Sequence, residues 1–204
     1  MSVKLNFSTV GQGKDIVLLH GWGVNSGVWQ PLLPYLQDDY RVTLVDIPGF
    51  GVNQKILPSP YNLQTVAALI AEQIPSNSSL IGWSLGGLIA QQIALSYPEK
   101  LKQLVLVCSS PKFSRSEDWL SIDRKVLAVF SKQLEHDFTK TLERFLAIQA
   151  MGSESARQDV RKIKLAIQQY PEPSGHALSV GLELLDQCDL RTQLSHLSVP
   201  CHVF

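Results

Sequence analysis

The sequence predicts an α/β fold in which a mostly parallel sheet is covered by helices on both faces. The first observation is four short, mostly apolar runs at residues 15–20, 41–46, 79–83 and 103–108, which are typical of strands buried on both faces. The second is the helical spacing of apolar residues between these runs, as at residues 66–74 and 85–93. Strands that alternate with helices favour a parallel sheet with helices packed on each side.

The second half of the chain has a different character, which predicts a helical insertion. Between about Pro111 and Leu185 no buried strand is evident, and the apolar spacing predicts helices over residues 126–134, 138–148 and 154–169. Residues 198–204 (SVPCHVF) then have the pattern of a new core strand. We therefore expect three parts: residues 1–110 as the first part of the core, 111–185 as a helical cap, and 186–204 as a return to a core whose last strands are missing.

The composition argues against several classes of function. The 204 residues carry 18 basic and 18 acidic side chains, so the net charge gives no case for binding nucleic acid or an anionic membrane. No apolar run reaches the roughly 20 residues of a membrane span, and the N-terminus lacks the apolar core of a signal peptide. The three cysteines form no CxxC pair, which favours free thiols in a reducing compartment over a zinc site. We expect a cytoplasmic protein without metal or cofactor, monomeric if full length.

The clearest chemical signal is the pentapeptide GWSLG at residues 82–86, which matches the pattern G-x-S-x-G. It follows a predicted strand and opens a predicted helix, which is the context of the nucleophile in α/β hydrolases. Such a turn holds a serine, here Ser84, in a strained conformation, and the flanking glycines remove Cβ atoms where strand and helix crowd together. The amino end of the helix also places the N–H of Leu85 where it can donate to an oxyanion.

A second loop, residues 20–23 (HGWG), ends the first buried strand and is placed to return over the serine. In this fold that loop supplies the second oxyanion N–H, which we expect from Trp22; the alternative is that Trp22 is a core aromatic side chain. His20 is expected to orient the loop by hydrogen bonding rather than to act as the catalytic base. In the turn at residues 46–51 (DIPGFG), Asp46 is expected to accept hydrogen bonds from loop N–H groups.

These elements, in this order and with these spacings, resemble the α/β-hydrolase-fold esterases. The match is closer to one family: LLHGWG, LVDIPGFG and LIGWSLGGLIAQQIALSYPE in the core, with ERFLAIQAMG-x-E-x-ARQD in the cap, resemble the pimeloyl-[acyl-carrier protein] methyl ester esterases of biotin biosynthesis. The resemblance covers essentially the whole chain, and the cap segments distinguish this family from the wider group. It implies a carboxylesterase that hydrolyses the methyl ester of pimeloyl-acyl carrier protein.

The same resemblance implies roles for individual residues. It makes Ser84 the nucleophile, gives the oxyanion N–H groups to Trp22 and Leu85, and places these three in the substrate site. It places the acyl chain along Phe145, Leu146, Ala147, Ile148 and Gln149. From the residues alone, that segment suits a methylene chain with a polar tip, and ordinary packing of the cap on the core is the alternative.

The expected partner is an acidic carrier protein, which requires a basic surface. Lys140 and Arg144 are four residues apart, as are Arg157 and Arg161, so each pair shares a helical face. The resemblance assigns these four residues to partner binding, and a solvated surface is the alternative. Lys140 stands where the family tends to have arginine, which weakens bidentate contact with a carboxylate or phosphate but keeps the charge.

One part of the expected catalytic pattern is missing. A serine nucleophile needs a general base and an acid that orients it, and in this fold an Asp or Glu and then a His follow the serine along the chain. The sequence stops at residue 204, before the expected Gly-x-x-Asp segment, and its later histidines lack the context of a catalytic base: His136, His176, His196 and His202. We therefore expect a truncated esterase with little or no turnover and an exposed hydrophobic sheet edge. The alternatives are another small-molecule α/β hydrolase and a non-catalytic fragment that binds acyl carrier protein.

Overall fold

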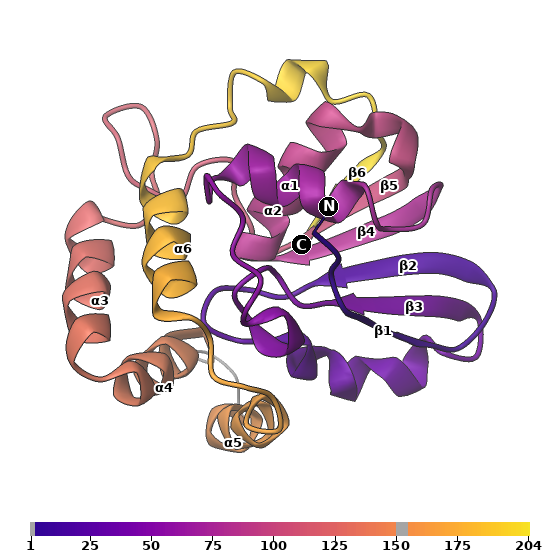
Figure 1. The fold of residues 1–204 in the computed structure, drawn as a ribbon. Coiled ribbons are helices and arrows are strands. Elements are labelled where there is room, and N and C mark those ends of the chain that lie inside the picture. The colour runs from indigo at the N-terminus through magenta and orange to yellow at the C-terminus, as the bar shows by residue number, and fades with distance from the viewer. Residues whose placement is uncertain (1–2, 150–154) are drawn as a thin grey trace.

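The computed structural model describes residues 3–149 and 155–204 and confirms the predicted α/β fold (Figure 1). Within these residues one sheet has the strand order β1-β3-β2-β4-β5-β6, and only β1 runs antiparallel to its neighbour. The strands are β1 (Phe7–Val10), β2 (Lys14–Leu19), β3 (Tyr40–Val45), β4 (Ser78–Trp83), β5 (Leu101–Val107) and β6 (Cys201–Val203). The four predicted apolar runs correspond to β2, β3, β4 and β5, and each begins within two residues of the expected position.

The two faces of the sheet are buried by different elements, which explains why the central strands are apolar on successive residues. In β2, Val17 and Leu19 belong to the large core cluster under the helices α1 (Leu63–Ala71) and α2 (Leu85–Ser96). Ile16 and Leu18 face the other side, in a smaller cluster with residues of the 3₁₀ helix η1 (Ser26–Tyr35). Three short 3₁₀ turns lie in the connecting segments: η2 (Gly51–Asn53), η3 (Pro98–Lys100) and η4 (Leu194–His196).

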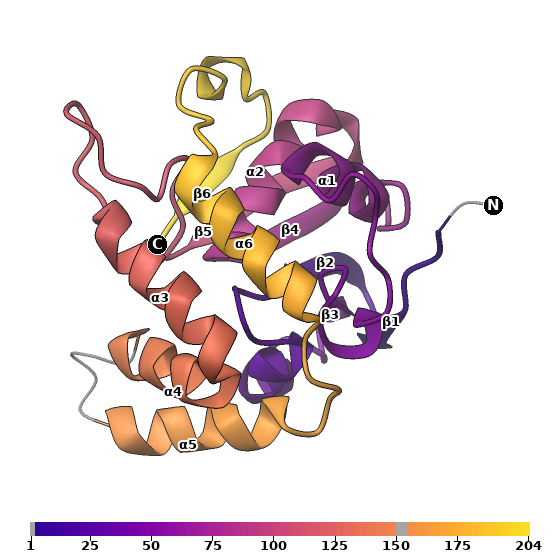
Figure 2. The same ribbon diagram turned by 60° about the vertical axis from the view of Figure 1, so that its left-hand side comes forward.

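Four further helices follow β5: α3 (Arg124–His136), α4 (Phe138–Gln149), α5 (Ala156–Ile167) and α6 (Gly175–Gln187). The first three confirm the predicted helices, except that residue 154, the start of the third prediction, lies outside the described residues. Figures 1 and 2 show α3, α4 and α5 standing away from the sheet, while α6 returns along the core between them and α2. The sequence analysis did not predict α6 as a helix of its own.

The two segments that join these helices to the core are bound to each other. The Leu190 N–H donates to the carbonyl of Pro111 at 2.9 Å, and the Arg191 guanidinium pairs with Asp118 at 2.8 Å and with Asp189. Hydrogen bonds from Ser116 and Arg191 lower the pKa of Asp118 to about 2. These contacts fix where the helical segment leaves and re-enters the core.

β6 confirms the strand pattern seen in residues 198–204 and pairs in parallel with β5. It lies at the edge of the described sheet, where the side chains of Val203 and Phe204 are 66% and 77% exposed.

Candidate active site

Ser84 forms the turn between β4 and α2, with backbone angles of φ 53° and ψ −117°. A non-glycine residue rarely adopts positive φ, and such strain persists only where the surroundings hold it. Here the Ser84 N–H donates to the carbonyl of Val107 on β5 at 3.1 Å. Its carbonyl accepts from the N–H of Gly87 at 2.9 Å and from the Ser109 hydroxyl at 2.9 Å. Hydrogen bonds to its N–H and to its carbonyl therefore hold the strained serine at the end of the strand.

The glycines around Ser84 are required by close packing against main-chain atoms and against the side chain of Ser109. A Cβ added at Gly82 would lie 2.5 Å from the carbonyl oxygen of Gly86, and one at Gly86 would lie 2.6 Å from the carbonyl oxygen of Leu19. A Cβ at Gly87 would collide with the side chain of Ser109. The first turn of α2 is thus in direct contact with both β4 and the end of β2, as the G-x-S-x-G pattern predicts.

Two main-chain N–H groups near this turn have no acceptor. Over residues 3–149 and 155–204, neither the N–H of Leu85 nor that of Trp22 donates in a hydrogen bond. The two residues converge on Gly181 of α6, where an added Cβ would meet Trp22 Cδ1 at 2.8 Å and Leu85 Cδ2 at 3.3 Å. Buried N–H groups are almost always paired, so two free ones beside a strained serine are suited to donate to an oxyanion.

The side chain of Trp22 is fully buried, so the alternative of a core aromatic residue describes it correctly. Its indole N–H donates to the carbonyl of Leu178 on α6 at 2.9 Å, and its ring meets Phe145 edge-on with centroids 5.4 Å apart. The side chain therefore joins the loop to α4 and α6, while the main-chain N–H stays free. The core role of the ring and the predicted role of the N–H are compatible.

His20 orients the loop, as predicted. Its Nε2 accepts a hydrogen bond from the N–H of Ile47 at 3.0 Å, so Nδ1 carries the proton and donates to the carbonyl of Gly21 at 2.8 Å. Nε2 also lies 3.7 Å from the Asp46 carboxylate, but as an acceptor it forms no ion pair there. Burial of the ring lowers the pKa of His20, against a smaller opposing effect of Asp46, which keeps the ring neutral. Both nitrogens are used, so His20 is not the base.

The turn after β3 behaves as predicted. The Asp46 carboxylate accepts hydrogen bonds from the N–H of Ser26 at 2.6 Å and of Val52 at 2.8 Å. Asn53, which the sequence did not single out, donates to the Asp46 carbonyl at 2.7 Å and accepts from the N–H of Asn6 at 2.8 Å. This buried network holds the loops after β2 and β3 against one another.

The predicted acyl-binding segment occupies the second half of α4, and its residues point in different directions. Phe145 contacts Trp22, and Leu146 is buried in a cluster with Val24, which follows the loop at residues 20–23. Ala147 is exposed and Ile148 is 41% exposed. The side chain of Gln149 lies outside the described part of the structure. Only the Phe145 and Leu146 side chains are therefore seen on the side that faces the core.

The four predicted partner-binding residues are all exposed, on α4 and α5. Lys140 forms an ion pair with Asp137 at 3.2 Å. Lys164, on the same face as Arg157 and Arg161, instead bonds Glu143 of α4. This inter-helix pair fixes α5 against α4, and the sequence pattern alone did not reveal it.

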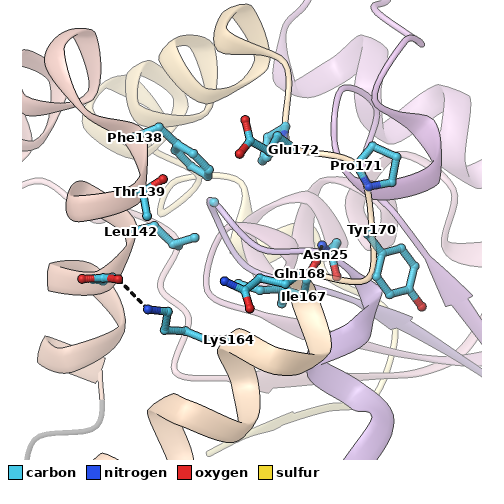
Figure 3. Close-up of a pocket in the computed structure, with 13 residues that line it drawn as sticks. Asn25, Phe138, Thr139, Leu142, Lys164, Ile167, Gln168, Tyr170, Pro171 and Glu172 are labelled. Atoms are coloured by element: carbon cyan, nitrogen blue, oxygen red, sulfur yellow. Dashed lines mark hydrogen bonds and ion pairs between the residues drawn. The ribbon is translucent and has the colours of Figure 1, made fainter.

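A cavity of about 140 Å³ lies between α4, α5 and the segment at residues 170–173 (Figure 3). Leu142 and Ile167 form apolar walls, the Lys164–Glu143 pair lies at one side, and Gly23 of the loop at residues 20–23 also contributes. Ser84 is 6% exposed and is not among the residues that line this cavity. The cavity thus adjoins the loop that carries Trp22 rather than the serine itself.

Two searches of the described chain set limits on other functions. No cluster of three or more His, Cys, Asp or Glu residues there is placed to hold a metal ion. None of the helices in that part of the chain is long and apolar enough to cross a membrane.

Comparisons with known proteins agree with this geometry. A family model described as the alpha/beta hydrolase fold matches residues 15–194. A protein of Pseudoalteromonas atlantica named pimeloyl-[acyl-carrier protein] methyl ester esterase is 52% identical over 202 residues, which cover 99% of this chain and 78% of that protein. One of the same name from Aeromonas hydrophila is 50% identical over 93% of this chain and 75% of its own length.

Solved structures show the same architecture. An esterase from Exiguobacterium antarcticum superposes with a TM-score of 0.83 and 23% identity, over 98% of this chain and 75% of that one. A structural likeness at this identity shows the fold alone, whereas the family model and the curated relatives match in sequence. The chain therefore belongs to the α/β-hydrolase family and is a hydrolase of its esterase group.

Proposed function

We propose that this chain hydrolyses the methyl ester of pimeloyl-acyl carrier protein, with Ser84 as the nucleophile. The observation that carries the proposal is the strained Ser84 beside two main-chain N–H groups, of Trp22 and Leu85, that lack acceptors. The substrate is taken from the names of relatives that are 44–52% identical over nearly the whole chain. The sequence resemblance supports a place for this reaction in biotin biosynthesis.

The chemistry follows from this arrangement. The Ser84 oxygen attacks the ester carbonyl carbon, and the Trp22 and Leu85 N–H groups stabilise the resulting oxyanion. The Ser84 hydroxyl proton goes to the departing methoxide, which leaves as methanol. Water then attacks the acyl-enzyme, returns a proton to the Ser84 oxygen and leaves a free carboxylate at the end of the acyl chain. Because no described histidine is bonded to Ser84 and both nitrogens of His20 are used, we assign no base to this chain.

We propose that residues 111–185 act as a substrate cap between two core segments, 1–110 and 186–204. The inward side chains of Phe145 and Leu146 support an apolar wall beside Trp22. A role for Ala147, Ile148 or Gln149 needs contacts made by substrate or by another part of the protein. The free state of all three cysteines supports a reducing, cytoplasmic compartment, and the monomeric state stays a prediction.

The first test is hydrolysis of short p-nitrophenyl esters and of methyl pimeloyl-acyl carrier protein by the wild type and by Ser84→Ala. The wild type should show hydrolysis that depends on Ser84. Its rate should be low if no general base contacts the serine, because general-base catalysis contributes roughly 10²–10⁴-fold to the rate. Equal rates in the two proteins would remove Ser84 from the mechanism. A dominant preference for long acyl esters would favour a different hydrolase.

The second test concerns the carrier protein. Arg157→Glu with Arg161→Glu should weaken binding of the acyl carrier protein and reduce the salt dependence of that binding, because attraction between exposed charges is screened by salt. The matched control is Lys4→Glu with Lys102→Glu, two exposed residues outside the cap that give the same change in charge. Equal weakening by both pairs would show a general charge effect and contradict docking on α5.

A further inference from the structure

The last turn of α5 rests on residues 24–28, which come directly after the loop at residues 20–23. Asn25 is 4% exposed, and its side-chain amide nitrogen donates to the carbonyl of Ile167 at 2.9 Å (Figure 3). The last carbonyls of a helix have no partner within it, and this one accepts from the Tyr170 N–H at 3.2 Å as well. Asn25 therefore joins the core to the end of α5.

The other half of the same amide is fixed within the core. The Asn25 Oδ1 accepts from the Gly27 N–H at 3.0 Å and so caps η1. Because a carbonyl only accepts and an N–H only donates, the two bonds fix the orientation of the amide. A Cβ added at Gly27 would lie 2.7 Å from the carbonyl oxygen of Ala166, so the main chain of α5 lies directly on this turn. The Ser26 N–H, between the two, donates to Asp46 and holds the turn to the core.

The other contacts of α5 are apolar or exposed. Three of its side chains lie in the small cluster that includes Val24: Val160, Ile163 and Ile167. The Lys164–Glu143 ion pair joins α5 to α4, with both side chains partly in solvent. Apolar burial has no preferred direction, whereas a hydrogen bond to a buried carbonyl does. Asn25 is therefore suited to set where the end of α5 lies on the core.

The position of α5 matters for the proposed substrate because its acyl chain is tethered to a carrier protein. Arg157 and Arg161 are exposed on α5 and are the residues proposed to dock that protein, while Ser84 must meet the ester at the far end of the tether. We infer that Asn25 is a positioning residue that sets the docking helix α5 relative to Ser84, an inference that rests on the proposed function. A small ester needs no docking, so only the carrier-bound substrate depends on this placement.

Asn25→Ser removes the donor to Ile167 and keeps an oxygen that can cap η1. Binding of acyl carrier protein, followed by fluorescence titration in Ser84→Ala proteins so that no turnover occurs, should weaken about 3- to 10-fold, the factor expected for the net contribution of one hydrogen bond. The kcat/KM for methyl pimeloyl-acyl carrier protein should fall by at least as much, while that for p-nitrophenyl acetate stays at the wild-type value. Equal losses on the two esters would overturn the inference.

The matched control is Asn62→Ser, at another asparagine that caps a helix. Its side chain accepts from the Thr65 N–H at 2.8 Å at the start of α1, so this variant should leave carrier binding unaltered. A loss of carrier affinity equal to that of Asn25→Ser would reveal a general effect of removing a capping asparagine and would contradict a specific role for Asn25.

A double-mutant cycle tests whether Asn25 acts through α5. In the pair Arg157→Glu with Arg161→Glu the docking contact of α5 is lost, so the further change Asn25→Ser should cost little additional carrier affinity. The same loss of affinity from Asn25→Ser in both backgrounds would show that its effect does not pass through α5, and the inference would fall.

Gly27→Ala gives a second variant that retains Asn25. Its Cβ would press on the carbonyl of Ala166 and move the end of α5, so it should weaken carrier binding while hydrolysis of p-nitrophenyl acetate persists. Wild-type carrier affinity in both variants would overturn the inference, as would a wild type that does not bind the carrier protein. If hydrolysis by the wild type does not depend on Ser84, the proposed function fails, while the titrations, which need no turnover, still decide the role of Asn25.

Discussion

Gly82→Ala tests whether the tight contact between β4 and α2 positions Ser84. The added Cβ would lie 2.5 Å from the Gly86 carbonyl oxygen and 2.6 Å from the Gly87 Cα, whereas ordinary contact begins at 3.4 Å. Both neighbours are main-chain atoms, so no side-chain rotation relieves the clash. The strand and the helix must therefore separate by about 1 Å, within the range in which misplacement of reacting groups costs about 100-fold in rate.

The stability effect has two opposing parts. Replacing glycine by alanine within a strand favours folding by about 0.5–1 kcal/mol, and overpacking of a well-packed core costs about 1–3 kcal/mol. The steric cost is larger, so we expect net destabilisation of about 1–2 kcal/mol. Urea denaturation gives the free energy of unfolding, and hydrolysis of p-nitrophenyl acetate gives the Ser84-dependent rate.

The control is Gly175→Ala at the start of α6, where an added Cβ meets nothing within 4 Å. This change should leave the rate unaltered and the stability equal or slightly higher. Wild-type rate and stability in Gly82→Ala would refute the reasoning, because they would show that the turn tolerates a side chain where the structure leaves no room.

Three other predictions follow from single contacts. Trp22→Phe removes the indole donor to the Leu178 carbonyl and should lower the free energy of unfolding by about 1–2 kcal/mol; an unchanged urea midpoint would contradict that role. Leu146→Ala should lower the free energy of unfolding by about 2–5 kcal/mol because Leu146 is 1% exposed. Ile148→Ala should change that free energy by no more than about 0.5 kcal/mol because Ile148 is 41% exposed. Similar losses in the two variants would contradict the assignment of Leu146 to the inward face of α4. Burial lowers the pKa of His20 in the folded chain below its ordinary value near 6.5. As the pH falls, His20 therefore takes up a proton in the unfolded chain at a higher pH than in the folded chain. The contribution of His20 to stability is complete above about pH 6.5 and is lost as the pH falls below it. Comparing wild type with His20→Asn by denaturation between pH 5 and 7.5 isolates this effect, and parallel curves would rule it out.

Local patterns were sufficient for most of the core and for the nucleophile. Strands buried on both faces leave continuous apolar runs, which is why β2, β3, β4 and β5 were predicted within about two residues. β1 escaped prediction because its four residues (FSTV) are only half-buried or exposed, so they carry no apolar run. η1 contains Pro31 and Pro34 and forms a 3₁₀ helix, whose spacing differs from the α-helical period.

The sequence by itself determined the fold class, the position of Ser84 in a strand-to-helix turn, and the place of the loop that carries Trp22. These follow from the spacing of apolar residues and glycines along a short stretch of chain. Only the tertiary structure decided the tautomer of His20, the contact of Trp22 with α6, and which residues of 145–148 face inward. The reason is that such features depend on contacts between distant segments, such as the bond between residues 22 and 178, which no local pattern encodes.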